Sequence, residues 1–348
     1  MKLSPFTIVN GCTPENLKEN YYAIIQRMRL LITLASIVIA ACGYSQSADD
    51  SKAKETFIRN KIKAQTSLDY TYNGEKPAVT GVKTSLTLYD ASGNVSQVTT
   101  FNPKGQVLNI EKYKYDTRGN KTEYTRYASG TEGKAAYQKI SKYNEKNQVI
   151  EESGFDGVEN FKNTYAHNTQ GDMTEIRYLT NNVLKEKRIF TKEGNITHVS
   201  IYNAAGTNTS KLVLSYDAKK NLVEEAVYGV NQSALEKKTY HYDENKNLKE
   251  ESKYKLDKIT LKTLYNYNSA GNLIDISEES PGSPRFIKKI FTYDAQGNVL
   301  GIQWRRKGNE AFNIISYTFD SKGLCTTAET FYPATKYRVL TKYVYEVY

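Results

Sequence analysis

The sequence offers few side chains whose type and spacing could support catalysis. Its three histidines, His167, His198 and His241, are far apart, and the neighbouring segments of similar sequence have no histidine at the corresponding positions. A catalytic base or a metal ligand is recognised by its partners, and these histidines share none. We therefore interpret each one as a polar residue of a strand or turn.

Carboxylates are abundant, but they recur at equivalent positions instead of forming one acid and base pair. Glu224 and Glu250 hold the same place in successive segments, which indicates a solvated row facing lysines. Isolated Asp-x-x-Gly loops lack the clustered oxygen ligands that calcium requires. Cys12, Cys42 and Cys325 are too few for a disulfide framework or a metal cluster. The sequence predicts no enzyme, no metal site and no cofactor.

One local departure indicates a candidate ligand site. The segment VLGIQWRRK places Arg305 where equivalent segments have tyrosine, and Trp304, the only tryptophan, then points to the opposite face of its strand. Trp304, Arg305 and Arg306 together suit stacking on, and hydrogen bonding to, a sugar or an acidic ligand. A local bulge that exchanges the two faces of the strand explains the same residues, and it is the interpretation that we favour.

A repeated six-residue motif organises most of the chain. YDASGN at position 89 returns in related forms about every 26 residues. The copies are YDTRGN at 115, YNEKNQ at 143, HNTQGD at 167, FTKEGN at 190, YDAKKN at 216, YDENKN at 242, YNSAGN at 267, YDAQGN at 293 and FDSKGL at 319. A second, weaker turn signal falls halfway between copies. Each unit therefore predicts a strand, a tight turn, a second strand and a looser turn.

The motif has the chemistry of a tight hairpin turn. In Asp-x-x-Gly-Asn the aspartate can accept backbone N–H bonds, and the glycine takes the left-handed conformation that closes a bulged hairpin. Where lysine replaces this glycine, at Lys220 and Lys246, we expect the following Asn221 or Asn247 to take the left-handed position. The flanking residues alternate with period two, which predicts strands with cross-strand aromatic ladders.

These units predict an all-β fold. Strands of about nine residues, from Leu68 to Tyr348, would form an elongated, twisted antiparallel β-meander of about ten to eleven hairpin repeats. Residues 48–64 look helical and are expected to cap it. The final strand, YVYEVY, would be an exposed edge that pairs with a partner or a second copy.

The N-terminal region has the features of a targeting segment. The run MRLLITLASIVIAAC, from Met28, is typical of a signal peptide and is too short for a membrane span. Its last four residues resemble a bacterial lipobox, so Cys42 is the predicted lipidation site, with ordinary secretion as the alternative. The predicted division is 1–27 as an upstream extension from a misplaced start codon, 28–42 as signal peptide, 43–67 as linker and short helical cap, and 68–348 as repeat array.

Charge and patterning exclude two classes of partner. The formal net charge of +10 is spread along the strands and forms no basic block, which argues against nucleic acid. Glu224 and Glu225 put carboxylates in mid-strand on both faces, so no lipid-facing apolar band repeats. We therefore expect no transmembrane span in the mature chain.

The Tyr-Asp-x-x-Gly-Asn pattern, followed by Leu or Val and a trailing aromatic residue, resembles the YD repeats of bacterial RHS-type proteins over roughly residues 68–348. In that family the repeats wind into a β-shell around a C-terminal toxin and have been linked with carbohydrate binding. This chain has Asn where the family also uses Arg. Its repeats run to the last residues, so we do not expect the toxin role. The resemblance implies a surface-associated β-repeat protein that binds sugar.

Two function classes follow. The first is a non-enzymatic protein of the bacterial cell envelope, lipid-anchored to the outer membrane on its periplasmic or surface side, or secreted, that binds a polysaccharide through exposed tyrosines. The second is an assembly scaffold whose tyrosine-rich face is core or contacts another envelope protein. A binding module would leave an aromatic face open, whereas a scaffold would cover it.

Overall fold

The tight turns form as the motif predicts. The computed structural model describes residues 44–128, 133–231 and 233–348, so the predicted upstream extension and signal peptide lie outside the described residues. In the turn at 90–94, Asp90 Oδ1 accepts the backbone N–H groups of Ser92 and Asn94, and Oδ2 accepts the Asn94 side-chain amide. Gly93 has a φ of 72°. The carboxylate thus replaces the hydrogen-bond partners that the turn backbone lacks.

Two turns differ from the expectation at the glycine position. Lys220 and Lys246 themselves adopt the left-handed conformation, each with a φ of 66°. Asn221 and Asn247 instead keep the contacts of the other turns, donating backbone and side-chain N–H groups to the aspartate. The prediction for these asparagines is wrong because their hydrogen bonds to the aspartate fix the asparagine position. The left-handed strain then falls on the lysine.

The chain contains one helix and 23 strands within the described residues. Helix α2 spans Tyr44–Arg59, and the strands are β1 Ile62–Asn73, β2 Lys76–Pro77, β3 Val82–Tyr89, β4 Val95–Phe101, β5 Val107–Tyr115, β6 Lys121–Ala128, β7 Tyr137–Tyr143, β8 Val149–Phe155, β9 Asn160–His167, β10 Met173–Thr180, β11 Val183–Glu193, β12 Ile196–Asn203, β13 Asn208–Tyr216, β14 Leu222–Gly229, β15 Ala234–Tyr242, β16 Leu248–Lys255, β17 Lys258–Tyr267, β18 Leu273–Ser280, β19 Ser283–Tyr293, β20 Val299–Trp304, β21 Asn313–Phe319, β22 Cys325–Tyr332 and β23 Tyr337–Val347. The helix ends earlier than predicted, and the first strand starts at Ile62, before the expected Leu68.

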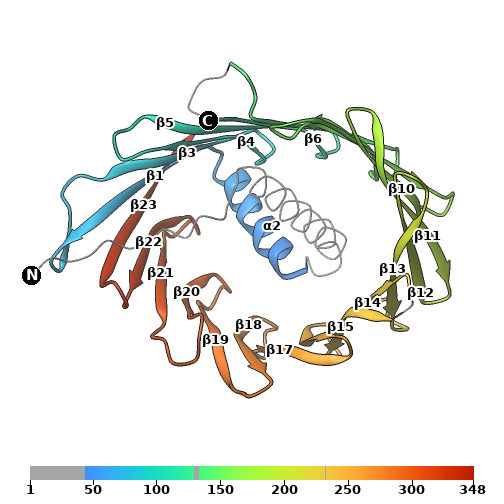
Figure 1. Ribbon diagram of the computed structural model, residues 1–348. Helices are drawn as coiled ribbons and strands as arrows, with labels where there is room; N and C mark the ends of the chain where they lie inside the picture. Colours follow the sequence, from blue (N-terminus) through green and yellow to red (C-terminus); the bar gives the residue numbers. More distant parts are fainter. Residues whose placement is uncertain (1–43, 129–132, 232) are drawn as a thin grey trace, which may run out of the picture. The chain divides into compact units, whose positions relative to one another are not determined.

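The sheet closes into a barrel, which corrects the predicted open meander. All strands except the short β2 form a closed, antiparallel ring of 22 strands (Figure 1). β23 pairs with β1 from Ile62↔Val347 to Thr71↔Val339, and β1 pairs with β3 on its other side. The YVYEVY segment is therefore an internal strand of the ring and not an exposed edge.

Repeated bulges explain the closure. The register slips immediately before the aromatic residue of the motif, as at Tyr115, Tyr242 and Tyr293. A β-bulge bends its strand and increases the local twist. Because the bend recurs at the same point of each hairpin, the bends add up until the first and last strands meet. Hairpins without these bends would be needed for an elongated, open array.

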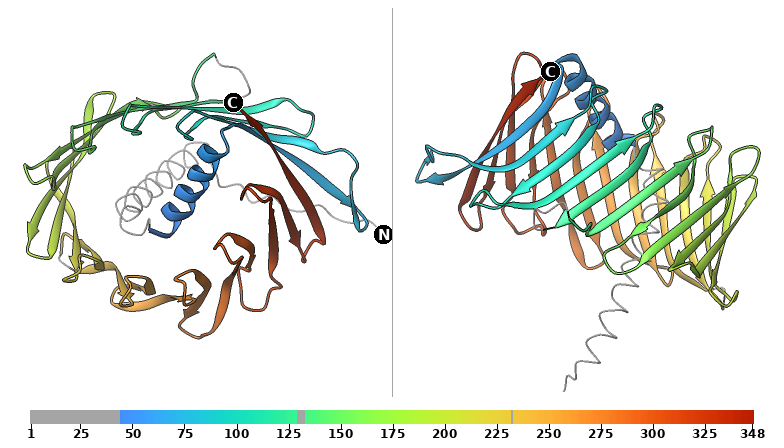
Figure 2. Two further views of the ribbon diagram at one scale, coloured as in Figure 1. Left: turned by 180° about the vertical axis from the view of Figure 1, so that it is seen from behind. Right: turned by 90° about the horizontal axis from the view of Figure 1, so that it is seen from above.

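The last turns of α2 pack against the closing strands on the inner side of the ring (Figures 1 and 2). The Phe57 ring lies 4.8 Å from the Tyr89 ring and 6.1 Å from the Tyr345 ring, measured between centroids. Ile62 and Leu324 complete this small buried cluster. Residues 53–59 thus stabilise the place where β1, β3 and β23 meet.

The contact with Phe57 identifies the inner face of the sheet, because paired residues share a face and alternate along each strand. Following the register around the ring from Tyr89 and Tyr345 returns to the same face at β1. A set of buried apolar residues lies on this inner face between β10 and β13. Its members are Ile176, Val199, Ile201, Leu212 and Leu214, none more than 7% exposed. Buried apolar side chains therefore line this section of the inner wall, with Arg188 paired between Ile176 and Ile201.

The motif tyrosines link each hairpin to the preceding one. Their hydroxyl groups donate to the backbone carbonyl of the first residue after the previous tight turn. The pairs are Tyr115 with Val95, Tyr143 with Lys121, Tyr242 with Leu222, Tyr267 with Leu248, Tyr293 with Leu273 and Tyr345 with Cys325, at 2.7 to 3.0 Å. We call these residues the rim tyrosines. Each bond of this kind contributes about 1 kcal/mol to stability.

Replacing Lys246 with glycine should stabilise the protein. Glycine adopts a φ of 66° without the Cβ clash, and Lys246 is exposed. We expect the free energy of unfolding to rise by about 0.5 to 1 kcal/mol. Urea denaturation of Lys246→Gly measures this. Asn245→Gly, one residue earlier in the same turn, is the matched control and should not stabilise. Equal effects of the two substitutions would contradict the strain assigned to Lys246.

Candidate functional site

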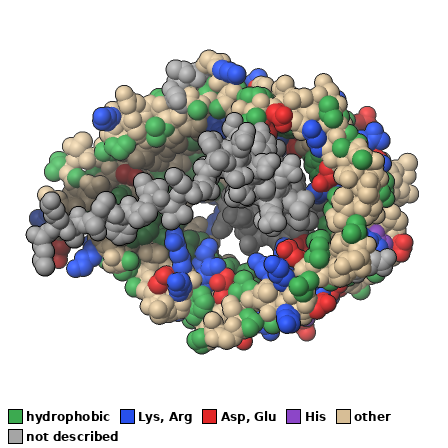
Figure 3. All heavy atoms as spheres, in the orientation of Figure 1, with side chains coloured by type: hydrophobic (Ala, Val, Ile, Leu, Met, Phe, Trp, Pro, Cys, Tyr) green, Lys and Arg blue, Asp and Glu red, His purple; other side chains and the backbone are tan. Residues whose placement is uncertain are grey.

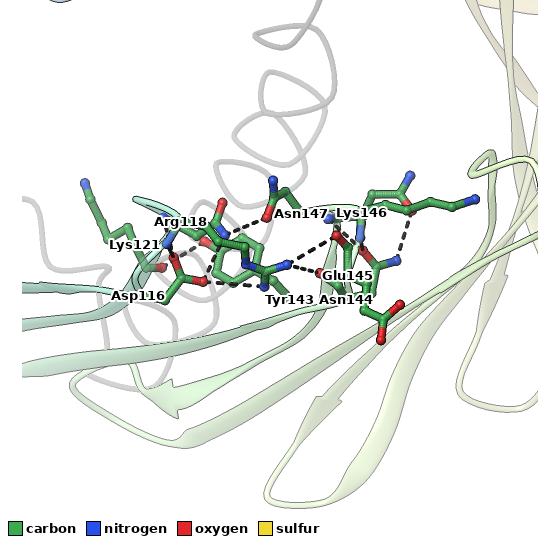
Figure 4. Close-up of polar contacts among 10 residues, drawn as sticks. Asp116, Arg118, Lys121, Tyr143, Asn144, Glu145, Lys146 and Asn147 are labelled. Atoms are coloured by element: carbon green, nitrogen blue, oxygen red, sulfur yellow. Dashed lines mark hydrogen bonds and ion pairs between the residues drawn. The ribbon is translucent and has the colours of Figure 1, made fainter.

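Adjacent tight turns are tied together along one rim of the barrel (Figure 4). Arg118 reaches from its own turn to the next and donates to the carbonyls of Asn144 and Glu145, at 3.0 and 3.3 Å. The Asn120 amide donates to Asn147 Oδ1 in the same pair of turns. Lys146 then reaches onward to a carbonyl of the following turn. Cations of the chain thus bridge neighbouring turns of this rim.

A second row of aromatic residues lies on the outer face, where each ring is covered by a cation. The pairs are Lys83 with Phe101, Lys112 with Tyr127, Lys134 with Phe155, Lys187 with Tyr202, Lys237 with Tyr254 and Lys342 with Tyr70, with the ammonium nitrogen 4.7 to 5.9 Å from the ring centroid. We call this set the outer row. The lysines compete with any ligand that would stack on these rings.

A third set of aromatic residues lies on the inner face. Its first ring, Tyr113, lies under Lys121, whose Nζ is 4.7 Å from the ring centroid, and among the described residues no cation lies over the other three rings. Tyr113, Tyr124, Tyr137 and Phe161 follow one another across β5, β6, β7 and β9, with ring centroids 5.2, 5.6 and 6.2 Å apart. We call this set the inner ladder. Each ring is half-buried, so a face or an edge remains accessible. Offset rings at these separations form a continuous aromatic strip.

Charged groups accompany the inner ladder. Glu111 accepts a hydrogen bond from the Tyr113 hydroxyl at 2.5 Å. Further along the same face, Glu152 accepts from Lys139 and from the Tyr165 hydroxyl, both at 2.7 Å. Burial, followed by the neighbouring Glu152 carboxylate, raises the pKa of Tyr165 well above its ordinary value. These tyrosines therefore stay protonated and act as hydrogen-bond donors at neutral pH.

Arg188 ends this polar region on β11. Its side chain is only 2% exposed, its Nε donates to Glu186 at 2.6 Å, and its guanidinium lies 5.0 Å from the Tyr178 ring. The Nη1 atom has no hydrogen-bond partner among the described residues. Arg188 is thus held by its ion pair with Glu186 and by stacking on the Tyr178 ring. Its neighbours on the adjacent strands are the buried apolar residues Ile176 and Ile201.

The structure separates the three residues of the predicted ligand site. Trp304 pairs with Lys289 and Asn313, which places it on the inner face, and its ring meets Tyr332 edge-on at 6.1 Å. Arg305 donates to the carbonyls of Ile287 and Gly308 and stacks on Phe312 at 4.4 Å. The Arg306 backbone N–H bonds Glu310. Trp304 and the arginines therefore do not converge on one spot.

The cysteine and the histidines that the sequence singled out lie on separate strands. Cys325 is half-buried, and burial raises the pKa of its thiol to about 11, so the reactive thiolate is disfavoured. His167 and His198 lie on different strands. The described residues contain no group of three or more His, Cys, Asp or Glu side chains placed to hold a metal ion. Cys42, the predicted lipidation site, lies outside the described residues.

The outer wall carries charged pairs in mid-strand. Glu151 on β8 lies between Lys142 and Lys162, at 2.8 Å from each, and the hydrogen bonds from these lysines lower the pKa of its carboxyl. In the space-filling view, basic and acidic side chains are both scattered around the visible rim (Figure 3). Among the described ranges, no helix has the length and apolar character needed to cross a membrane.

Comparisons with known proteins give only distant likenesses. No family model matches the chain, and no curated protein matches it. The crystal structure of TcdB2-TccC3-TEV aligns with 80% of this chain at 11% identity and a TM-score of 0.27, and this chain spans about a fifth of its length. A porin-like protein from Bacteroides uniformis aligns over 82% of this chain and 97% of its own, at 9% identity and a TM-score of 0.30. A porin-like protein from Bacteroides vulgatus aligns over 70% and 95%, at 12% identity and a TM-score of 0.24. Such low scores carry no argument about function.

The inner ladder is the feature that sequence reasoning did not single out. The cross-strand pairing of aromatic residues was expected, but the sequence could not show which rings would share the inner face. A hint lay in the strand register, because Tyr113 pairs directly with Tyr124. Whether these rings face the interior of the barrel is decided only by the closure of the ring.

The turn aspartates should make stability fall on acidification. The side-chain hydrogen bond from Asn120 lowers the pKa of Asp116 below 3.8, and backbone N–H groups add to it against burial. Burial opposes the shift at Asp217 and Asp243, but hydrogen bonds from Asn221 and Asn247 outweigh it. A lowered folded-state pKa contributes stability above the unfolded-state pKa, and this contribution is lost as pH falls through the folded value.

We therefore expect the free energy of unfolding, measured by urea titration, to decrease as the pH falls from about 5 to about 3. The variant with Asp116→Asn, Asp217→Asn and Asp243→Asn should lose less stability over this range than the unmodified protein. Glu244→Gln, an exposed position of the same turn as Asp243, is the control. An unchanged pH dependence in the triple variant would contradict the role assigned to these carboxylates.

Proposed function

We propose that this protein is a non-enzymatic binding barrel of the bacterial cell envelope, and that its inner ladder binds a carbohydrate. The observation that carries the proposal is the strip of Tyr113, Tyr124, Tyr137 and Phe161 beside the carboxylate of Glu111, in which, among the described residues, Lys121 covers the Tyr113 ring alone. Sugar rings stack their apolar C–H faces on aromatic rings and hydrogen-bond through their hydroxyls. The inner ladder offers both kinds of contact on one wall.

The three sets of aromatic residues support this assignment by their differences. The rim tyrosines use their hydroxyls to hold neighbouring hairpins together, and the rings of the outer row are covered by lysines. These two sets fit the scaffold function, in which tyrosine is structural. In the inner ladder, Tyr113 donates to Glu111 and lies under Lys121. Among the described residues no cation lies over Tyr124, Tyr137 or Phe161, so these three rings are the ones that fit ligand binding.

The envelope location rests on the sequence alone. The signal-like segment and the lipobox ending at Cys42 support a lipid anchor, with secretion as the alternative. The outer wall suits contact with water. Glu151 and its two lysines lie in mid-strand on this wall, where a lipid-facing barrel would carry apolar residues. The ligand is a polysaccharide of the envelope or its surroundings, and no nucleic acid is involved.

Binding should depend on the inner ladder. In an array of bacterial and host polysaccharides at moderate salt, we expect the purified protein to bind a defined subset. Tyr124→Ala and Tyr137→Ala should each weaken that binding by about fivefold or more, because aromatic stacking contributes roughly 1 to 3 kcal/mol per ring. Titration calorimetry with the best polysaccharide measures the change.

Tyr254→Ala in the outer row is the matched control, since it removes an equally large ring that Lys237 covers. It should leave binding unchanged. Trp304→Ala tests the separate site that the sequence predicts at Trp304, Arg305 and Arg306. Binding that survives both ladder substitutions, or that is lost only with Tyr254→Ala, would refute the assignment to the inner ladder and favour the scaffold function.

A further inference from the structure

The two rims of the barrel differ in the apolar character of their turns. The tight turns contain a single apolar residue larger than alanine, Leu324, and it is only 5% exposed. At the opposite end, the connections from β1 to β3, from β4 to β5 and so on to β22 and β23 form what we call the loose-turn rim. Four of these connections carry an apolar residue that is 62% to 101% exposed. These residues, the apolar tips, are Val79, Val158, Val230 and Leu256.

The backbone of Leu256 shows that this tip does not serve the fold. Leu256 and Asp257 form a two-residue hairpin turn in which both are left-handed, with φ values of 48° and 59°. The two-residue turn between β10 and β11 has asparagine at both positions, Asn181 and Asn182, with φ values of 49° and 63°. Asparagine tolerates this conformation better than leucine does. A side chain that is both strained and exposed points to a function outside the fold.

The apolar tips lie on different sides of the ring. Strand β1, which leads to the first tip, lies across the ring from β14 and β15, which flank the third (Figure 1). A closed ring of 22 strands spaced about 4.8 Å apart is at least about 30 Å across. A small ligand cannot reach tips on both sides of such a ring. A continuous, extended surface contacts all of them together.

Basic residues accompany the apolar tips. Among the described residues of the loose-turn connections, counted with one residue on either side, eight exposed lysines and arginines outnumber four exposed acidic residues. Lys255 and Lys258 flank the turn of Leu256, and Asp257 between them lies 3.9 Å from Lys237. The tight turns are also rich in lysine, so the apolar tips and not the charge distinguish the loose-turn rim. The charge does favour an anionic partner.

We propose that the loose-turn rim rests on an anionic lipid membrane, with the apolar tips inserted at the boundary between headgroups and acyl chains. Apolar side chains at this boundary and basic residues near anionic headgroups are the two contributions that hold peripheral proteins on membranes. Only turns enter the lipid, so charged pairs in mid-strand, such as Glu151 with Lys142, stay in water. The contact goes beyond the proposed function and does not use the inner ladder, so either proposal can fail without the other.

A fluorophore placed at a tip reports insertion directly. In the full chain with its native cysteines replaced by serine, which also removes the predicted lipid anchor, Val230→Cys is labelled with the environment-sensitive dye NBD. Vesicles of phosphatidylcholine and phosphatidylglycerol in a three-to-one ratio should shift the emission to the blue and at least double its intensity. Nitroxide-labelled lipid should quench it. The same dye at Asn245→Cys, in a tight turn, is the matched control and should not respond.

Leu256→Asn tests the strained tip in the chain labelled at residue 230. It should raise the lipid concentration for half-maximal response about tenfold, the lower end of what burying one leucine contributes. It should not lower the free energy of unfolding, because asparagine suits the left-handed conformation. Ile196→Asn is the control, since it removes an exposed apolar residue beside a tight turn, and it should leave the vesicle response unchanged.

No response of residue 230 to vesicles, or equal responses of residues 230 and 245, would overturn the proposal. A response that follows protein concentration and needs no lipid would also overturn it and would assign the rim to contact between two copies of the chain. Vesicles of phosphatidylcholine alone should need several times more lipid, and an equal response would contradict the part given to the basic residues. Polysaccharide binding should be the same with Leu256→Asn, because the inner ladder is not involved.

Discussion

The hydrogen-bonded pairing of β1 with β23 is the constraint on which the rest of the structure depends. This pairing runs from Ile62↔Val347 to Thr71↔Val339 and joins the first and last strands of the sheet. It removes both sheet edges, which would otherwise be sites of aggregation. It also gives the sheet an inside and an outside, and that distinction separates the inner ladder from the outer row.

The closure follows from a feature that each repeat carries locally. The aspartate of the tight turn fixes a bulge beside the motif tyrosine, and the bulge bends the hairpin. The rim tyrosines then fix the distance between successive hairpins through their hydroxyls. Helix residues such as Phe57 pack where the ring closes. The hydrogen bonds of each tight turn therefore determine both the local hairpin and the closure of the whole ring.

Much of this could be predicted from sequence, but only where the cause is local. The motif around Asp90 and Gly93 contains its own hydrogen-bond donors and acceptors, so the turn could be recognised without a structure. The face of Trp304 followed from simple alternation. The ring could not be predicted in the same way. The motif indicates a bulge in each hairpin but not the size of its bend, and the bends decide the shape only when they are summed.

The functional features, too, could be predicted from sequence only where their cause is local. Arg305 could be recognised as unusual, but not its use of two backbone carbonyls, because these come from the preceding strand and the following loop. The bridge from Arg118 to the next turn is likewise visible only when neighbouring turns are compared in space, because its acceptors Asn144 and Glu145 lie more than twenty residues further along the chain.

A disulfide across the closing strands tests the account most directly. Ser67 pairs with Tyr343 in the register of β1 and β23, and paired Cα atoms about 4.5 to 5.5 Å apart are within disulfide range. In a chain whose native cysteines are replaced by serine, Ser67→Cys with Tyr343→Cys should form an intramolecular disulfide in the monomer upon oxidation. The pair Ser67→Cys with Val339→Cys, out of register, should not. Failure of the in-register pair to cross-link, or cross-linking only between molecules, would contradict the closed barrel.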